Sequence, residues 1–173
     1  MTTKTPSSRR PSANPWDEID DLYQQLLYWL YDRGNRRKAG EFAEKLELLL
    51  NKVSDQETVF GEECRSLISE QRGDLPAAIK HRENEIRLIK RVHQLSAGTP
   101  GNDLVRKRYG YDDLSDRLDL LAVLYHDNRE LDKAISTLQE SKSLCEAHGI
   151  AFDGQDVLDE YLAEEKAGTE GEK

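Results

Sequence analysis

Three short stretches of this chain share a turn that is followed within a few residues by an alanine. They are GNRRKAG (Gly34–Gly40), GDLPAAI (Gly73–Ile79) and RELDKAI (Arg129–Ile135). The shared alanines are Ala39, Ala78 and Ala134. Apolar residues on both sides of each turn recur at the three- and four-residue spacing of one helix face. Each stretch is therefore predicted to be the inner turn of a hairpin of two antiparallel helices, with the small alanine where the helices cross closely.

Helix-starting and helix-ending residues fit the same hairpins. Pro15 suits the first turn of a first helix, and Asp74 can cap a fourth. Ser54-Asp55 is predicted to cap the third helix, and Gly149 to end the sixth in a left-handed conformation. Strand signals are nearly absent, because β-branched residues do not alternate with polar ones. The predicted fold is all-α: about three stacked antiparallel helical hairpins plus a C-terminal helix, arranged as an α-α superhelix.

Composition separates one helical domain from two polar ends. Residues 1–14 are rich in Ser, Thr, Pro and Arg, and residues 166–173 are equally poor in apolar side chains, so both are predicted to be disordered tails. The helical domain is expected over residues 15–165, with its last helix at about 154–165. A loop or insertion is predicted at about 95–111, where SAGTPGND supplies small, turn-forming residues.

The stretch from Leu120 to Leu144, LLAVLYHDNRELDKAISTLQESKSL, resembles the tetratricopeptide repeat (TPR), a helix–turn–helix unit of about 34 residues. The similarity lies in a small residue (Ala122), an aromatic one turn later (Tyr125), a turn, and then Ala-Ile followed by Leu138. The middle copy departs from the repeat, since Arg82 stands where a large apolar residue belongs. The spacing departs too, because the shared alanines are 39 and 56 positions apart and the longer gap contains the 95–111 segment.

The resemblance implies a role for the first helix of each hairpin, which in TPR stacks usually lines a concave groove that binds peptides. The groove positions it implies here, termed the acidic groove below, are Gln24, Tyr28, Tyr31, Glu63, Leu67, Glu70, Asp116, Asp119, Val123 and His126. Tyrosine offers contact area at a low entropic cost. The alternative is that Tyr28 and Tyr31 pack against the second helix or the N-terminal segment. Because acidic residues stand where chaperone-binding TPR domains carry basic ones, a basic or apolar partner segment is expected. The implied function is a non-catalytic adaptor or scaffold for another protein.

A second candidate surface is basic. It comprises Lys80, Arg87, Lys90, Arg91, Arg106, Lys107 and Arg108, termed the basic strip below. Lys80, Arg87 and Arg91 fall on one helix face, so nucleic acid or an acidic partner could dock there. The alternative is that Glu83, Glu85 and the acidic run DDLSD neutralise the strip within the protein.

Overall charge and hydropathy restrict the classes of partner. The net charge of −9 argues against nucleic acid as the main partner, and no apolar run reaches the roughly 18 residues that a membrane span requires. Cys64 and Cys145 lie far apart and form no metal-binding pair, so both are expected to be small buried residues in a reducing compartment. These features favour a cytoplasmic protein.

No pattern of reactive residues predicts catalysis or a cofactor. The chain has no phosphate-binding glycine loop and no HExxH zinc motif. His81 and His93 are too far apart on one helix to share a metal, and His126-Asp127 has only ordinary hydroxyls nearby. The acidic run DDLSDRLD lacks the glycine and ligand spacing of a calcium loop. The sequence therefore predicts neither an enzyme nor a metal or cofactor site.

Overall fold

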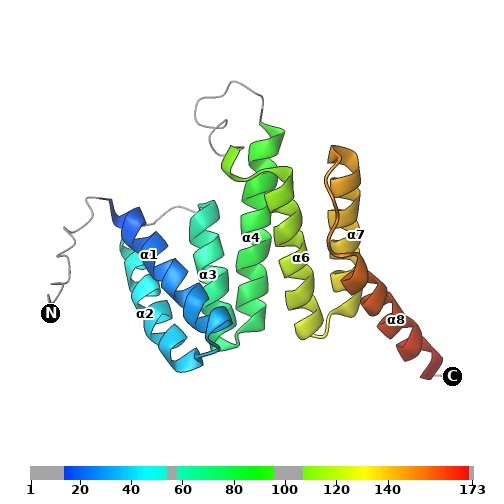
Figure 1. The fold of residues 1–173 in the computed structure, drawn as a ribbon, viewed down its shortest axis with the longest axis horizontal. Coiled ribbons are helices and arrows are strands. Elements are labelled where there is room, and N and C mark those ends of the chain that lie inside the picture. The colour runs from blue at the N-terminus through cyan, green and yellow to red at the C-terminus, as the bar shows by residue number, and fades with distance from the viewer. Residues whose placement is uncertain (1–13, 54–57, 96–106, 172–173) are drawn as a thin grey trace, which may run out of the picture. The chain divides into compact units, whose positions relative to one another are not determined.

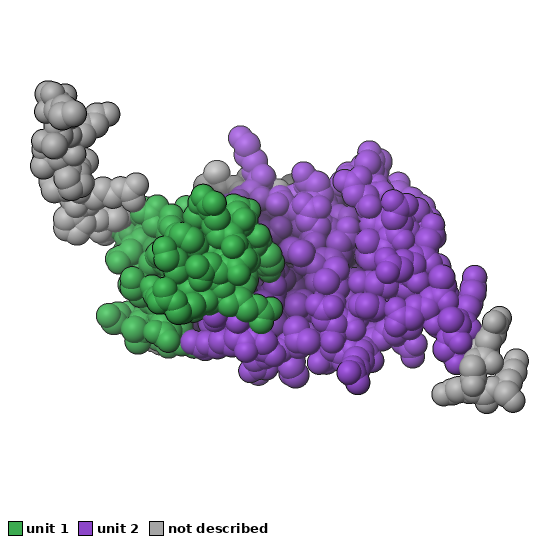
Figure 2. Space-filling model, turned by 60° about the horizontal axis from the view of Figure 1, so that its bottom comes forward, with its two compact units in different colours: residues 1–56 green, residues 57–173 purple. Residues whose placement is uncertain are grey.

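The computed structural model describes residues 14–53, 58–95 and 107–171, and every regular element in these ranges is a helix. The chain is therefore all-α, as predicted. It divides into two compact units, residues 1–56 and residues 57–173, which Figure 2 shows in different colours. The predicted tail at 1–14 lies outside the described residues except for Asn14, and so does most of the predicted 95–111 loop.

Unit 1 is a helical hairpin made of α1 (Pro15–Leu27), the π-helical turn η1 (Tyr28–Asp32) and α2 (Arg36–Val53). The Asn14 side chain caps α1 by accepting a hydrogen bond from the Trp16 amide, and Gly34 makes the turn with a φ of 58°. Its buried apolar side chains are Ile19, Leu26, Ala39, Ala43, Leu46 and Leu50. The π-helical turn, in which the Arg33 amide reaches the Tyr28 carbonyl, was not predicted.

Unit 2 begins with the hairpin of α3 (Val59–Arg72) and α4 (Leu75–Gln94). Thr58 caps α3 through the Gly61 amide, whereas the predicted cap, Ser54-Asp55, lies outside the described residues. Gly73 ends α3 at a φ of 76°, and the Asp74 carboxylate accepts a hydrogen bond from the Ala77 amide. The predicted turn between these two helices is therefore confirmed.

The second hairpin of unit 2 consists of α6 (Tyr111–Asp127) and α7 (Leu131–His148), joined by a turn in which Arg129 has a φ of 62°. The Gly110 amide donates to the Asp113 carboxylate at the start of α6, and Gly149 ends α7 at a φ of 66°. Figure 1 shows α3, α4, α6 and α7 side by side in chain order.

The C-terminal helix α8 spans Gln155–Gly171. The prediction of a disordered tail from Lys166 was therefore wrong for residues up to 171. Ala163 and Ala167, together with charged residues that favour helices, allow the helix to continue although few apolar residues follow Leu162. On its inner side, α8 buries Leu158 and Tyr161.

Small side chains allow the helices of each hairpin to cross closely. Ala78, Ala122 and Ala134 are 0% exposed. The hydroxyl of Ser66 on α3 donates to the Ala78 carbonyl on α4 at 3.0 Å. Cys64 and Cys145 are buried and free, as predicted. The alanine shared by the three turns is thus a contact residue, which confirms its predicted role.

Candidate functional site

The acidic groove predicted from the resemblance begins in unit 1. Gln24 and Tyr31 are exposed there, and the Tyr31 side chain is 59% exposed. Tyr28 is half-buried, accepts a hydrogen bond from Arg33 Nε at 2.6 Å and packs edge-on against Trp29. Only Tyr31 of the two tyrosines is therefore mainly exposed to solvent.

The acidic-groove positions on α3 contact other residues of unit 2 or belong to its core. Leu67 is only 3% exposed and belongs to the core, so it is not a surface residue. Glu63 accepts from Arg117 Nη2, and Glu70 accepts from Arg82 Nη2, each at 3.4 Å. These two carboxylates neutralise arginines of their own chain, which leaves less charge for a basic partner.

The acidic-groove positions on α6 divide into exposed and covered ones. Asp116 is exposed, and Val123 is 42% exposed. His126 stacks on the ring of Tyr161 from α8, with ring centroids 4.2 Å apart, and its Nε2 lies 2.9 Å from Glu164 Oε2. The C-terminal helix therefore covers the end of this surface where His126 lies.

Asp119 is half-buried between α6 and the segment that leads into α8. One of its oxygens, Oδ1, is buried and has no hydrogen-bond partner among the described residues. Burial raises the pKa of the Asp119 carboxyl, and a hydrogen bond with Ser141 opposes this rise. Burial, followed by the neighbouring Asp113, also raises the pKa of Asp116.

A buried ion-pair network joins α3, α4 and α6. Glu85 is 0% exposed and accepts hydrogen bonds from Arg82 Nη1 at 2.6 Å and from Arg117 Nε at 2.5 Å. Burial raises the pKa of Glu85, although both guanidinium groups act in the opposite direction. Arg117 also contacts Glu63 and Asp113. This network explains how Arg82 can be buried although its side chain is charged.

The basic strip is partly neutralised within the protein. Lys90 forms an ion pair with Glu140 of α7, which the sequence interpretation did not include. Glu85 pairs instead with the buried arginines, and Asp113 of the run DDLSD pairs with Arg117. Glu83 is the predicted acidic residue that lies beside the strip, in the same groove as Lys90.

The members of the basic strip do not form one continuous line. Arg108 lies over the rings of Phe60 and Tyr109, 5.7 Å from each centroid, and Lys107 is exposed next to it. Arg106 lies outside the described residues. Tyr109, within the predicted loop, is only 7% exposed, and its carbonyl oxygen lies 2.9 Å from His93 Nε2. The part of the strip that remains on one surface is therefore the α4 part, from Lys80 to Arg91.

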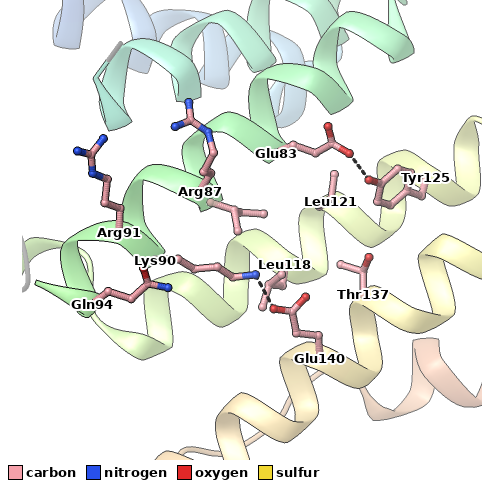
Figure 3. A pocket seen from close by; sticks show the side chains of 11 residues that line it. Glu83, Arg87, Lys90, Arg91, Gln94, Leu118, Leu121, Tyr125, Thr137 and Glu140 are labelled. Atoms are coloured by element: carbon pink, nitrogen blue, oxygen red, sulfur yellow. Dashed lines mark hydrogen bonds and ion pairs between the residues drawn. The ribbon is translucent and has the colours of Figure 1, made fainter. Parts of the chain in front are cut away.

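This α4 part borders a groove of about 670 Å³ between α4 and α7, with α6 beneath it, termed the α4–α7 groove (Figure 3). Its lining residues are Glu83, Ile86, Arg87, Lys90, Arg91, Gln94, Leu118, Leu121, Tyr125, Thr137 and Glu140. The apolar side chains of Ile86, Leu118 and Leu121 are almost completely buried, so they form its floor.

Two polar contacts cross the α4–α7 groove (Figure 3). Near one end, Lys90 Nζ of α4 reaches Glu140 Oε1 of α7, and near the other the Tyr125 hydroxyl of α6 donates to the Glu83 carboxylate. Burial, followed by the bond to Glu83, raises the pKa of Tyr125, so the phenol stays a donor. Arg87 and Arg91 extend from α4 on the opposite side from Lys90 and form an outer basic rim.

Two further clusters of polar and aromatic side chains lie near the ends and crossings of these helices. The buried hydroxyl of Ser115 lies 2.8 Å from Ser141 Oγ and 3.0 Å from Cys145 Sγ, at the crossing of α6 and α7. His93 and His148 stack on opposite sides of Tyr111. Among the described residues, no group of three or more His, Cys, Asp or Glu side chains is placed to hold a metal ion.

The basic face of α4 could be predicted from the sequence, but the α6 and α7 side of the α4–α7 groove was not predicted. Thr137 and Glu140 lie three positions apart on α7, yet nothing in the local sequence distinguishes them from the other polar residues of this helix. Their role depends on the packing of α7 beside α6. Arg117 was missed for the same reason, since its partner Glu85 lies 32 positions earlier in the chain.

Comparisons with family models, with curated proteins and with solved structures found no match for this chain. None of the helices in the described ranges has the length and apolarity needed to cross a bilayer.

Proposed function

We propose that this chain is a non-catalytic, TPR-like module that binds another protein, and that the α4–α7 groove is its binding site. The preferred partner is a segment with apolar residues that face the groove floor and carboxylates that face the basic rim. This differs from the basic partner expected for the acidic groove. A cytoplasmic adaptor or scaffold role fits this proposal.

The observation that carries the proposal is the combination of a hollow with the exposed guanidinium of Arg91 at its edge. Arg91 lines the groove and is exposed, and it forms no ion pair with the described residues. The competing site is weaker, because Glu63 and Glu70 are paired with arginines and Leu67 is buried. Charge complementarity at a solvent-exposed rim mainly increases the rate of association and the specificity for a partner.

Nucleic acid remains the alternative occupant of the basic strip. Glu83 and Glu140 stand within the groove, and a phosphate backbone would be repelled by both carboxylates. A carboxylate-bearing segment can place its few charges along the rim alone. The geometry therefore favours a protein segment over a polyanion.

The test uses a fluorescein-labelled peptide of about 15 residues with leucines on one helical face and glutamates on the other. Fluorescence anisotropy should show binding to the full chain, and the double variant Arg87→Glu, Arg91→Glu should bind at least about tenfold more weakly. The matched control is Arg36→Glu with Arg37→Glu, which makes the same charge change at exposed positions of α2.

Three other results would overturn the assignment. Equal binding by the rim variant and the control would exclude the α4–α7 groove. Tighter binding of the same peptide with lysines in place of glutamates, reduced by Asp116→Lys, would restore the acidic groove. Binding of a 20-nucleotide single-stranded RNA with a steep salt dependence, and none of the peptide, would favour the nucleic-acid alternative.

A further inference from the structure

The turn between α1 and α2 carries a dense group of cations. Residues 28–38, termed the basic aromatic turn below, contain the four basic side chains Arg33, Arg36, Arg37 and Lys38. The acidic residues beside them are Asp32 and Glu41, and the ion pair of Glu41 with Arg37 is exposed on both partners, at 53% and 80%. Water and salt weaken exposed pairs of this kind. The turn is therefore locally positive although the chain as a whole is acidic.

Three of these cations stand where a helix disfavours them. Arg36, Arg37 and Lys38 are the first three residues of α2, and the first turn of this helix contains no acidic residue. The N-terminal end of a helix carries a partial positive charge, so cations at that end reduce its stability. Proteins break such local rules mainly at functional sites. A bound anion would offset the repulsion.

Aromatic rings are interleaved with the cations. Lys38 Nζ lies 3.9 Å from the centroid of the Trp29 ring, and the Arg33 guanidinium lies over the ring of Tyr28 at 5.3 Å. Tyr28 and Trp29 pack edge to face with their centroids 5.2 Å apart, so these four side chains form one continuous cluster. Tyr31 follows in the same turn and is 59% exposed. An exposed ring and ordered cations therefore share the turn.

These rings are not part of the core of unit 1. Tyr28, Trp29 and Tyr31 all belong to the π-helical turn η1, which continues directly from α1, and none of its five residues is buried. Turns of this kind are rare and occur frequently at functional sites. Burial in the core does not explain why three aromatic residues are placed here, which leaves recognition of a ligand as their use.

A single strand of nucleic acid combines the two groups that such a cluster binds. Each nucleotide carries one phosphate, which attracts Lys and Arg, and one flat base, which stacks on an aromatic ring when it is unpaired. An acidic protein segment supplies charges without a flat ring beside each one. A membrane surface requires several apolar side chains that insert, whereas Tyr31 is the one large exposed side chain of this type in η1.

We infer that the basic aromatic turn binds single-stranded nucleic acid, with phosphates on its four cations and a base stacked on Tyr31. The inference goes beyond the proposed protein-binding function and does not depend on it. All the residues involved belong to unit 1, whereas the α4–α7 groove belongs to unit 2. The two ligands would therefore occupy different parts of the chain.

The acidic residues of α1 do not cancel the attraction. Asp17, Glu18, Asp20 and Asp21 lie near the start of the helix. Seven residues of helix separate Asp21 from Tyr28, which is about 10 Å along the axis. Charges in solvent are largely screened beyond about 8 Å at physiological ionic strength. The strand therefore meets mainly the local charge of the turn.

Salt dependence measures the phosphate contacts. Fluorescence anisotropy of a fluorescein-labelled single-stranded RNA of about 20 nucleotides should show binding to the full chain. Four phosphate contacts predict a slope of about −2.8 when the logarithm of the association constant is plotted against that of the salt concentration. The affinity should then fall about fiftyfold between roughly 50 and 200 mM NaCl. An affinity that salt does not change would exclude phosphate binding.

Substitutions separate the phosphate contacts from stacking. Arg36→Gln with Arg37→Gln removes two contacts and should reduce the slope to about −1.4. Tyr31→Ala should weaken binding at least about fivefold without changing the slope, because stacking on a base releases no counterion, and Tyr31→Phe should restore the affinity. The control Lys45→Gln with Lys52→Gln makes the same charge change at exposed positions of α2 outside the turn and should leave affinity and slope unchanged.

Four results would overturn the inference. Equal affinity for the strand and for its fully paired duplex would exclude stacking, since a duplex hides its bases. Binding to phosphatidylserine vesicles but not to RNA would make the turn a membrane contact. Loss of acidic-peptide binding in Arg36→Glu with Arg37→Glu would make it a protein contact. Loss of RNA binding in Arg87→Glu with Arg91→Glu, but not in the turn variants, would place the RNA on the basic strip.

The RNA and peptide measurements can fail separately. A chain that binds RNA at the turn but does not bind the acidic peptide would overturn the groove function alone. A chain that binds the peptide but no RNA would overturn the nucleic-acid inference alone. Tyr31, Arg36 and Arg37 are exposed, so their replacement should not unfold unit 1, and far-ultraviolet circular dichroism checks that each variant remains helical.

Discussion

Arg117 Nε of α6 lies 2.5 Å from Glu85 Oε1 of α4, and the Glu85 side chain is completely shielded from solvent. A charge in such a place is stable only while its partners remain, because the protein interior solvates an isolated ion poorly. The pair therefore fixes how the two hairpins of unit 2 meet.

Arg117→Met should destabilise the protein by about 3–5 kcal/mol, since it leaves Glu85 with a single buried partner. Urea unfolding followed by circular dichroism measures this loss. The control is Arg37→Met, whose side chain is 80% exposed and pairs with Glu41, and the expected change there is within about 0.5 kcal/mol. Equal losses for the two variants would contradict the role assigned to the network.

Ala134→Leu should cost about 1–3 kcal/mol, because Ala134 is 0% exposed at the crossing of α6 and α7 and a larger side chain must displace its neighbours. The same change at Ala147, an exposed position of α7, should have little effect on the free energy of unfolding. If both variants unfold at the same urea concentration, the shared alanine is not a close-contact residue.

Gly73→Ala should lower the free energy of unfolding by about 1 kcal/mol, because Gly73 has a φ of 76°, which side chains with a Cβ rarely adopt. A Cβ atom at this position would meet no other atom within 4 Å, so the cost comes only from the left-handed backbone. Gly168→Ala, within α8, should have the opposite effect and raise the free energy of unfolding by about 0.5–1 kcal/mol, because alanine favours a helix more than glycine does. Thermal unfolding of both variants tests the pair, and two changes of the same sign would refute the backbone argument.

Asp119→Asn should raise the melting temperature at pH 7, because burial disfavours the charged carboxylate and raises the pKa of Asp119 above its unfolded value of 3.8. The folded parent loses stability as the pH rises through this raised pKa. The difference in melting temperature between variant and parent should therefore be largest above the folded pKa of Asp119 and disappear below pH 3.8. A difference that does not change with pH would show that the charge of Asp119 is not its cause.

The helical hairpins could be predicted from sequence because their signals are local. Gly73 and Asp74 act on the residues beside them, and Ala134 marks a crossing within one hairpin. The candidate site could be predicted only in part. The basic face of α4 follows from the spacing of Lys80, Arg87 and Arg91, but Glu140 enters the site because α7 packs beside α6.

Buried polar residues were the least predictable feature. Arg82 is a departure from an apolar pattern when read alone, and only its contacts with Glu85 and Glu70 explain its burial. The π-helical turn at Tyr28–Asp32 has no sequence signal of its own, since its five residues also suit an ordinary helix.

The buried network also restricts how this sequence can diverge. A neutral substitution at position 85 would leave two guanidiniums without their shared carboxylate, and one at position 117 would leave that carboxylate with Arg82 alone. Single replacements are therefore disfavoured, whereas joint replacement of all the charges by apolar side chains of similar volume can be tolerated. Among sequences that keep this fold, positions 82, 85 and 117 should consequently be inherited as a set, charged together or apolar together.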